Sequence, residues 1–158
     1  MAGVFQRAIV VGASSGIGEA MARQLAAQGC HVALIARREE RLLSLKQELE
    51  SSGGVVLTFA HDVTHFQEAS GVFDRAVKDL GGLDLLVYAA GVMPSLEEHE
   101  YAFEKDRAMV ETNLLGAMAW LNPASAHMEA QRSGVILGIS SIAGERGRRA
   151  NPAYCTSK

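Results

Sequence analysis

The chain has 158 residues, of which 48% are hydrophobic and 21% charged, a balance typical of a globular domain rather than a disordered or fibrous chain. Its net charge of −3 argues against nucleic acid as the main partner, because phosphate-binding surfaces need a basic excess. No apolar run approaches the roughly 20 residues that span a bilayer, so we expect no membrane partner either. We interpret residues 1–158 as a single domain.

The two cysteines, Cys30 and Cys155, fit neither a metal spacing nor a disulfide framework. Thiols that stay reduced are typical of cytoplasmic proteins. His61 and His65 lie four residues apart, but they span a strand end and a helix start and no third ligand accompanies them. We therefore expect a cytoplasmic protein with no metal site.

Strands and helices alternate along the chain. Residues 8–11 form a short β-branched run that ends in glycine, which is typical of a strand buried on both faces. From residue 17 to residue 28 the apolar positions recur with the period of a helix. The pattern continues with strands expected at 32–36, 55–60, 83–89 and 135–139, and helices at 39–51, 65–80 and 103–130.

This alternation predicts right-handed βαβ crossovers and a parallel sheet with helices on both faces. The expected fold is α/β, a Rossmann-like doubly wound parallel sheet in the strand order 3-2-1-4-5. Ligands of such sheets bind at the carboxyl ends of the strands, where the strand order reverses.

A glycine-rich segment joins the first strand to the first helix. Glycines at this place permit a tight turn and let the backbone approach a pyrophosphate, while the helix N-terminus offers N–H groups to the anion. The alternative is a turn that binds nothing, but the strand–loop–helix setting favours nucleotide binding. The expected contacts come from Gly12, Ser14, Ser15, Gly16, Ile17 and Gly18.

Two arginines, Arg37 and Arg38, follow the second strand. An enzyme built for NAD usually places a carboxylate there to accept a hydrogen bond from the ribose 2′-hydroxyl, but this chain has Ala36. A guanidinium forks onto phosphate, so the pair favours NADP over NAD. The alternatives are a solvated basic run and Glu39 acting as a displaced acid.

The segment Tyr154-Cys155-Thr156-Ser157-Lys158 places a phenol and an ammonium four residues apart, on one face if it is helical. A phenol with a pKa near 10 must exchange a proton near pH 7, and lowering that pKa by ~2–3 units takes roughly 3–4 kcal/mol. One ammonium at ~4 Å supplies about that much at an effective dielectric constant of 20. The spacing therefore suits acid–base chemistry by the phenol.

Together, the G-x-x-x-G-x-G loop and the Y-x-x-x-K segment resemble the short-chain dehydrogenase/reductase family, over about residues 8–158. The resemblance implies an NADP(H)-dependent oxidoreductase that transfers hydride between the nicotinamide and a small-molecule carbonyl or secondary alcohol. In this family pattern Tyr154 is the acid/base, Lys158 lowers its pKa and holds the nicotinamide ribose, Ser141 positions the substrate, and Asn113 holds a water of the proton relay.

The resemblance also implies further cofactor contacts from Asp62 and Val63 at the adenine, from Ala90 and Gly91, and from Tyr154 and Lys158. Asp62 or Thr64 could instead, or in addition, cap the next helix. Two other functions remain open. One is a non-catalytic nucleotide-binding or interaction fragment, and the other is an epimerase or dehydratase, whose usual G-x-x-G-x-x-G loop is not present here.

The chain departs from the family pattern in two ways. Tyr88-Ala89-Ala90-Gly91 stands where the family has N-N-A-G, and Val11 replaces a threonine. Because losing both sides of a hydrogen bond can be nearly neutral, we interpret Val11 and Ala89 as a compensated apolar pair.

The chain also stops at Lys158, before the last two strands of the family. We expect an incomplete domain with an exposed fifth strand, a tyrosine helix too short to be stable alone, and poor activity. We expect its full-length parent to be an active homo-oligomer, since the family often pairs through the long helix and the tyrosine helix.

Overall fold

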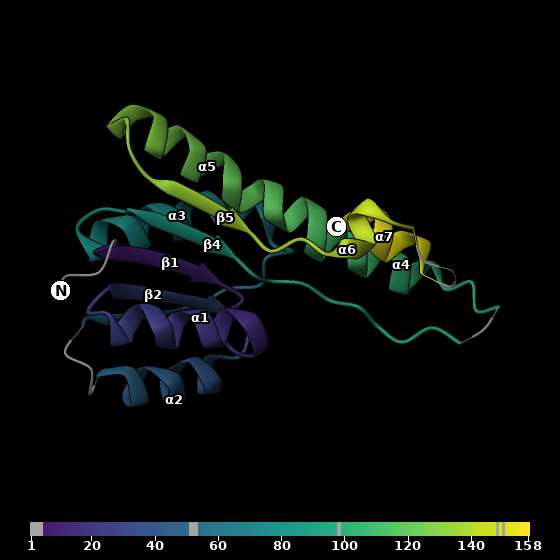
Figure 1. Cartoon of the computed structure of the whole chain (residues 1–158), viewed down its shortest axis with the longest axis horizontal. Coiled ribbons are helices and arrows are strands. Elements are labelled where there is room, and N and C mark those ends of the chain that lie inside the picture. The colour runs from purple at the N-terminus through teal and green to yellow at the C-terminus, as the bar shows by residue number, and fades with distance from the viewer. Residues whose placement is uncertain (1–4, 51–53, 98, 148, 150) are drawn as a thin grey trace.

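The computed structural model describes residues 5–50, 54–97, 99–147, 149 and 151–158. Its centre is a parallel sheet in the order β3-β2-β1-β4-β5, which confirms the predicted order (Figure 1). The strands are β1 Arg7–Val11, β2 His31–Ala36, β3 Val56–Ala60, β4 Leu85–Tyr88 and β5 Val135–Gly138. All neighbouring strands pair in parallel register, with Val11 opposite Ile35 on one side and Tyr88 on the other.

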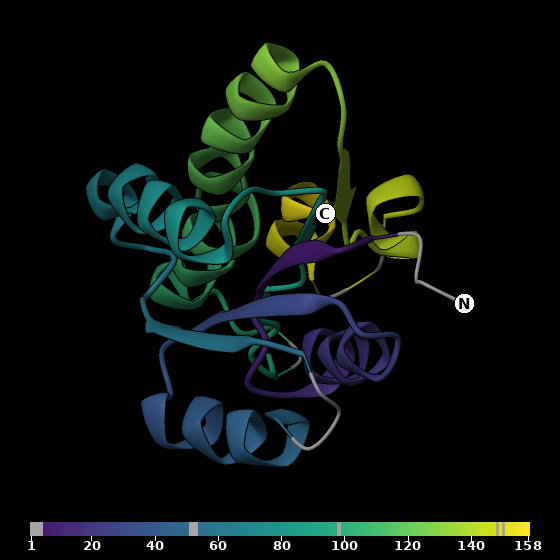
Figure 2. The ribbon, with the colours of Figure 1, turned by 90° about the vertical axis from the view of Figure 1, so that its left-hand side faces the viewer.

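Helices cover both faces of this sheet (Figures 1 and 2). Helices α1 (Gly16–Ala27) and α2 (Glu39–Glu50) pack on one face, and α3 (Phe66–Leu80) and α5 (Gly116–Gln131) pack on the other. Successive residues of β1 alternate between the two apolar clusters, as the pleat of a strand requires: Ala8 and Val10 join the first, Ile9 and Val11 the second. Burial on both faces explains why the strands are continuously apolar.

The long predicted helix at 103–130 is divided into three consecutive elements. Helix α4 (Phe103–Val110) leads into one π turn, η1 (Glu111–Leu115), and α5 continues from it. Apolar periodicity predicts a helix but does not reveal a single inserted residue within it, so the π turn was not predicted. Inside α5, Trp120 is fully buried, and an apolar side chain of this kind contributes about 1.5–3 kcal/mol when buried.

Two short helices lie near the end of the chain, α6 (Ile142–Glu145) and α7 (Pro152–Ser157). Helix α6 was not predicted, although Ser141 caps it by accepting a hydrogen bond from the Ala143 N–H at 3.2 Å. Helix α7 packs against α4 and α6 beyond the carboxyl ends of the strands (Figure 1). Packing against these neighbours compensates for its single turn.

Other bounds differ from the predictions by a few residues. Strand β4 begins at Leu85 rather than at residue 83, and α3 begins at Phe66 rather than at residue 65. Helix α2 is described as far as Glu50, and Ser51, where its end was predicted, lies outside the described residues. Strand β5 is at the edge of the sheet, with Val135 and Leu137 exposed, as predicted. None of the helices in the described part of the chain has the length and apolar character needed to cross a membrane.

Candidate functional site

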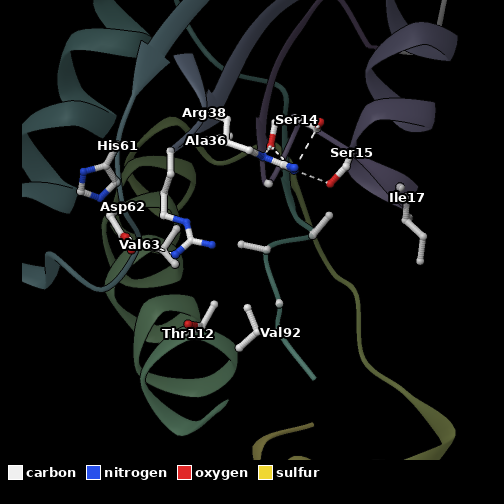
Figure 3. Close-up of a pocket in the computed structure, with 16 residues that line it drawn as sticks. Ser14, Ser15, Ile17, Ala36, Arg38, His61, Asp62, Val63, Val92 and Thr112 are labelled. Atoms are coloured by element: carbon white, nitrogen blue, oxygen red, sulfur yellow. Dashed lines mark hydrogen bonds and ion pairs between the residues drawn. The ribbon is translucent and has the colours of Figure 1, made fainter. Parts of the chain in front are cut away.

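A cleft of about 290 Å³ opens at the carboxyl ends of the central strands (Figure 3). The glycine loop forms one side of it, and residues at or after the ends of β2, β3 and β4, together with Thr112 of the π turn, form the rest. Of the predicted cofactor contacts, all but Gly18, Tyr154 and Lys158 line the cleft. It also includes residues that the sequence did not single out as contacts, namely Ala36, His61, Ala89, Val92 and Thr112.

Two glycines of the loop allow its close approach to the neighbouring strands. Gly12 has φ +88°, and a Cβ there would lie 2.5 Å from the Ala90 backbone nitrogen. A Cβ at Gly18 would overlap the carbonyl oxygen of Gly12. Gly18 therefore packs against the backbone of the loop and does not line the cleft.

The glycine loop ends at the N-terminus of α1, where Ser15 is the N-cap residue but makes no capping bond through its side chain. Its hydroxyl instead accepts a hydrogen bond from Arg38 Nη2 at 2.7 Å, and the Ser14 hydroxyl accepts from the same nitrogen at 2.9 Å (Figure 3). Helix N-termini carry N–H groups without helical partners and partial positive charge. This side of the cleft therefore gathers groups that attract an anion.

Arg37 also lines the cleft, and its side chain is 63% exposed, with its Nη1 3.5 Å from Asp62 Oδ2. Asp62 Oδ1 also accepts hydrogen bonds from the Thr64 N–H at 3.0 Å and the Thr64 hydroxyl at 2.9 Å. Partial burial alone would raise the pKa of Asp62, but the Thr64 hydrogen bonds and Arg37 outweigh it and hold this pKa below its usual value. Asp62 thus organises the turn before α3, whose N-cap residue is His65 rather than Asp62 or Thr64.

His61 is 4% exposed and stands at the rim of the cleft. Burial lowers the pKa of its imidazole, so the ring is neutral near pH 7. The Nδ1 atoms of His61 and His65 each lie 3.7 Å from Glu68 Oε2. The two rings thus lie beside the same carboxylate, that of Glu68.

Asn113 lies in the π turn and is 6% exposed. Its Oδ1 accepts from the Val92 N–H at 2.7 Å, and its Nδ2 donates to the Val92 carbonyl at 2.9 Å and to Ser157 Oγ at 3.0 Å. The carboxamide therefore ties the loop after β4 to helix α7. No sequence pattern indicated the Val92 contact, whereas Ser157 could have been noticed inside the Tyr154–Lys158 segment.

Lys158 lies beside Asn113 at the end of the cleft. Its Nζ donates to the Ile139 carbonyl at 2.8 Å, and a Cβ built at Gly91 would lie 3.5 Å from that Nζ and 3.3 Å from Asn113 Oδ1. Because Gly91 lines the cleft, the ammonium and the carboxamide meet where the glycine-loop cleft ends.

Helix α7 carries Tyr154 one turn before Lys158. Its N-cap residue is Asn151, whose Oδ1 accepts from the Tyr154 N–H at 3.3 Å. Ser157 Oγ donates to the Tyr154 carbonyl at 2.9 Å, and Ser140 Oγ donates to the Lys158 carbonyl at 2.6 Å. Ser140, in the segment that follows β5, is therefore joined to Lys158 at the end of the tyrosine helix.

The interpretation of Val11 and Ala89 as a compensated pair is wrong. Val11 belongs to the apolar cluster beneath α3 and α5, whereas Ala89 packs against the cluster beneath α1 and α2. Their side chains therefore lie on opposite faces of the sheet, as alternate strand positions do. The neighbour of Val11 in the register, on the same face, is Tyr88.

Comparison with protein families matches residues 6–158 to the family described as short chain dehydrogenase. An uncharacterised oxidoreductase from Myxococcus xanthus is 34% identical over 154 residues, which are 98% of this chain and 61% of that protein. The chain therefore spans about three fifths of the length of this relative.

Solved structures give the same result. A xylitol dehydrogenase with bound NAD⁺ superposes with a TM-score of 0.92 at 30% identity, over 97% of this chain and 59% of the other. An alcohol dehydrogenase from Thermococcus sibiricus in complex with 5-hydroxy-NADP superposes with a TM-score of 0.90 at 29% identity, over 97% and 65%.

Proposed function

The chain belongs to the short-chain dehydrogenase family, and from this premise we propose that the whole protein is an NADP(H)-dependent oxidoreductase acting on a small-molecule carbonyl or secondary alcohol. One observation carries the proposal. The cleft with the glycine loop at one end has Lys158 Nζ and Asn113 Oδ1 close to Gly91 at the other. Groups suited to hold a dinucleotide thus line the cleft, and two groups suited to proton chemistry lie next to its Gly91 end.

The donors of the cleft fit a dinucleotide. The α1 N-terminus and the Ser14 and Ser15 hydroxyls suit its pyrophosphate, while Asp62 and Val63 suit the adenine end. A 2′-phosphate beside the ribose would meet Arg37 and Arg38, which bind phosphate through paired N–H groups. When bound, the nicotinamide supplies or accepts the hydride.

The residues of the chain supply the proton. Tyr154 donates its phenolic proton to the carbonyl oxygen as hydride reaches the carbonyl carbon, and takes a proton back in alcohol oxidation. Lys158, one helical turn after Tyr154, would hold the nicotinamide ribose. Ser141 Oγ already accepts a hydrogen bond from Ala143 N, so its hydrogen remains available to the substrate oxygen. Asn113 supports the proton relay by fixing Val92 and Ser157.

Location and assembly follow the same proposal. We assign the protein to the cytoplasm, since its two cysteines suit a reducing compartment. Leu114, Leu115 and Met118 are exposed on the π turn and α5, which supports pairing of the whole protein into a homo-oligomer through the long helix.

The second candidate function is nucleotide binding without catalysis. Such a protein would bind the nucleotide in the cleft but would not turn over a substrate.

The test is a fluorescence titration of the whole protein and of residues 1–158 with NADPH and with NADH, followed by a panel of ketones and aldehydes. We expect NADPH to bind at least about tenfold more tightly than NADH, the gain from one charge-assisted phosphate contact. Equal affinity would contradict the NADP assignment. Tight NADPH binding by the whole protein with no turnover of any carbonyl would select the non-catalytic alternative.

A further inference from the structure

The π turn at Asn113 leaves one backbone carbonyl without its helical partner. The Gly116 N–H donates to the Glu111 carbonyl, five residues back. In an α-helix that amide would donate to Thr112, four residues back. The Thr112 carbonyl therefore needs a donor from outside the helix, because a buried carbonyl without one is costly.

Tyr88 provides this donor. Its hydroxyl donates to the Thr112 carbonyl oxygen at 2.7 Å, across 24 residues of sequence. Tyr88 is the last residue of β4 and is 3% exposed, so the bond is shielded from water. Burial, and to a lesser degree the charge of Asp62, raises the pKa of this phenol well above its ordinary value. The hydroxyl consequently remains protonated, and able to donate, near neutral pH.

Gly116, the first residue of α5, faces the Tyr88 hydroxyl. A Cβ at this position would lie 2.7 Å from the Tyr88 hydroxyl oxygen and 3.1 Å from the Val63 carbonyl oxygen. Glycine therefore leaves the space into which the phenol reaches. The Thr112 carbonyl, the buried Tyr88 hydroxyl and the space that Gly116 leaves for the phenol thus meet at one point.

We propose that Tyr88 is a positioning residue of the proton relay: its hydroxyl holds the π turn open at Thr112, and the turn directs the Asn113 carboxamide to Val92 and Ser157. Removing the inserted residue from the turn would rotate one side of the helix by about 100° relative to the other. Asn113 would then lose its contacts with the loop after β4 and with α7. The catalytic part of this inference rests on the proposed oxidoreductase function.

The experiment compares Tyr88→Phe with Tyr101→Phe in the whole protein, because Tyr101 is 91% exposed and loses the same atom. For Tyr88→Phe we expect kcat to fall about 10- to 100-fold, the usual effect of a misplaced catalytic group, with KM for NADPH and carbonyl changed less than about threefold. Hydrogen exchange of the Val92 amide, which donates to Asn113, should accelerate at least about tenfold. Tyr101→Phe should change neither quantity.

A second variant, Gly116→Ala, disturbs the same contact from the helix and carries the test alone if Tyr88→Phe does not fold. Both variants together should lower kcat by less than the product of their single effects, because they break one contact. Unchanged kcat and unchanged Val92 exchange in Tyr88→Phe would overturn the proposal, as would a rise in KM alone. If Tyr154→Phe keeps its turnover, the oxidoreductase mechanism fails, whereas the exchange measurement still decides the role of Tyr88.

Discussion

The two arginines after β2 differ in the contacts they already make. Arg38 donates to the hydroxyls of Ser14 and Ser15 at 2.9 and 2.7 Å, whereas Arg37 is mostly exposed and lies 3.5 Å from Asp62. Arg38 is thus held in place before any ligand arrives, and a preorganised donor loses less entropy on binding than a free one.

We expect Arg38→Ala to weaken NADPH binding by about 10- to 100-fold, as loss of a hydrogen bond to a charged group does. NADH binding should change less than about threefold, since NADH has no 2′-phosphate. Equilibrium titration of both cofactors measures this. Arg41→Ala, which removes the same charge from an exposed position on α2, serves as the control. Equal weakening of NADPH binding and NADH binding would mean that Arg38 stabilises the glycine loop and does not bind the 2′-phosphate.

A second prediction concerns Gly18. A methyl group there would overlap the Gly12 carbonyl oxygen, so Gly18→Ala should cost about 1–3 kcal/mol of unfolding free energy, as overpacking does, and weaken cofactor binding. Gly71→Ala is the control: it faces open space in α3 and should stabilise the protein by roughly 0.5–1 kcal/mol. Urea unfolding of both variants gives the comparison. Equal stabilities would refute the packing role of Gly18.

Strands β1 and β4 are fastened at their amino ends by Asp84. Its Oδ2 accepts from the N–H groups of Gln6 at 3.0 Å and Arg7 at 2.8 Å, and its Oδ1 lies 3.0 Å from the Arg7 guanidinium. Partial burial alone would raise the pKa of Asp84, but these donors outweigh it and hold the pKa below its usual value.

A carboxylate with a lowered pKa stabilises the fold at pH values above its unfolded pKa of about 3.9, and this contribution disappears as pH falls through the folded value. Asp84→Asn should therefore lower stability at pH 7 by about 1–3 kcal/mol and reduce the loss of stability below about pH 4. Thermal melts between pH 3 and pH 7 measure this. Asp74→Asn, at an exposed position of α3, should leave both quantities unchanged. A steep acid loss that persists in Asp84→Asn would contradict the assignment.

Some of the secondary-structure elements could be predicted from the sequence, and others could not. The strands and their order were predictable because β-branched runs buried on both faces differ clearly from helical patterns. The π turn was not, because it depends on a hydrogen bond between Tyr88 and Thr112. The pairing of Val11 with Ala89 failed because adjacent strand positions point to opposite faces, and the register that decides which side chains meet is a property of the sheet.

In the whole molecule, the candidate site is assembled from segments far apart in sequence. Motif spacing predicted Tyr154 and Lys158, and the glycine loop predicted the cleft. Neither motif predicted the hydrogen bonds that connect these segments: Asn113 bonds to Val92 and Ser157, and Lys158 bonds to Ile139. Tertiary contacts of this kind fix the position of α7, which is too short to be stable alone.

The central claim is that the phenol of Tyr154 exchanges the proton at the end of a cofactor cleft. The most direct test is the turnover of carbonyl reduction with saturating NADPH in the whole protein, comparing Tyr154→Phe with the exposed control Tyr101→Phe. The account predicts a fall in kcat of about 10²- to 10⁴-fold for Tyr154→Phe, the usual contribution of a general acid, with NADPH affinity retained and the control unaffected. Turnover by Tyr154→Phe at the level of the unaltered protein would contradict it.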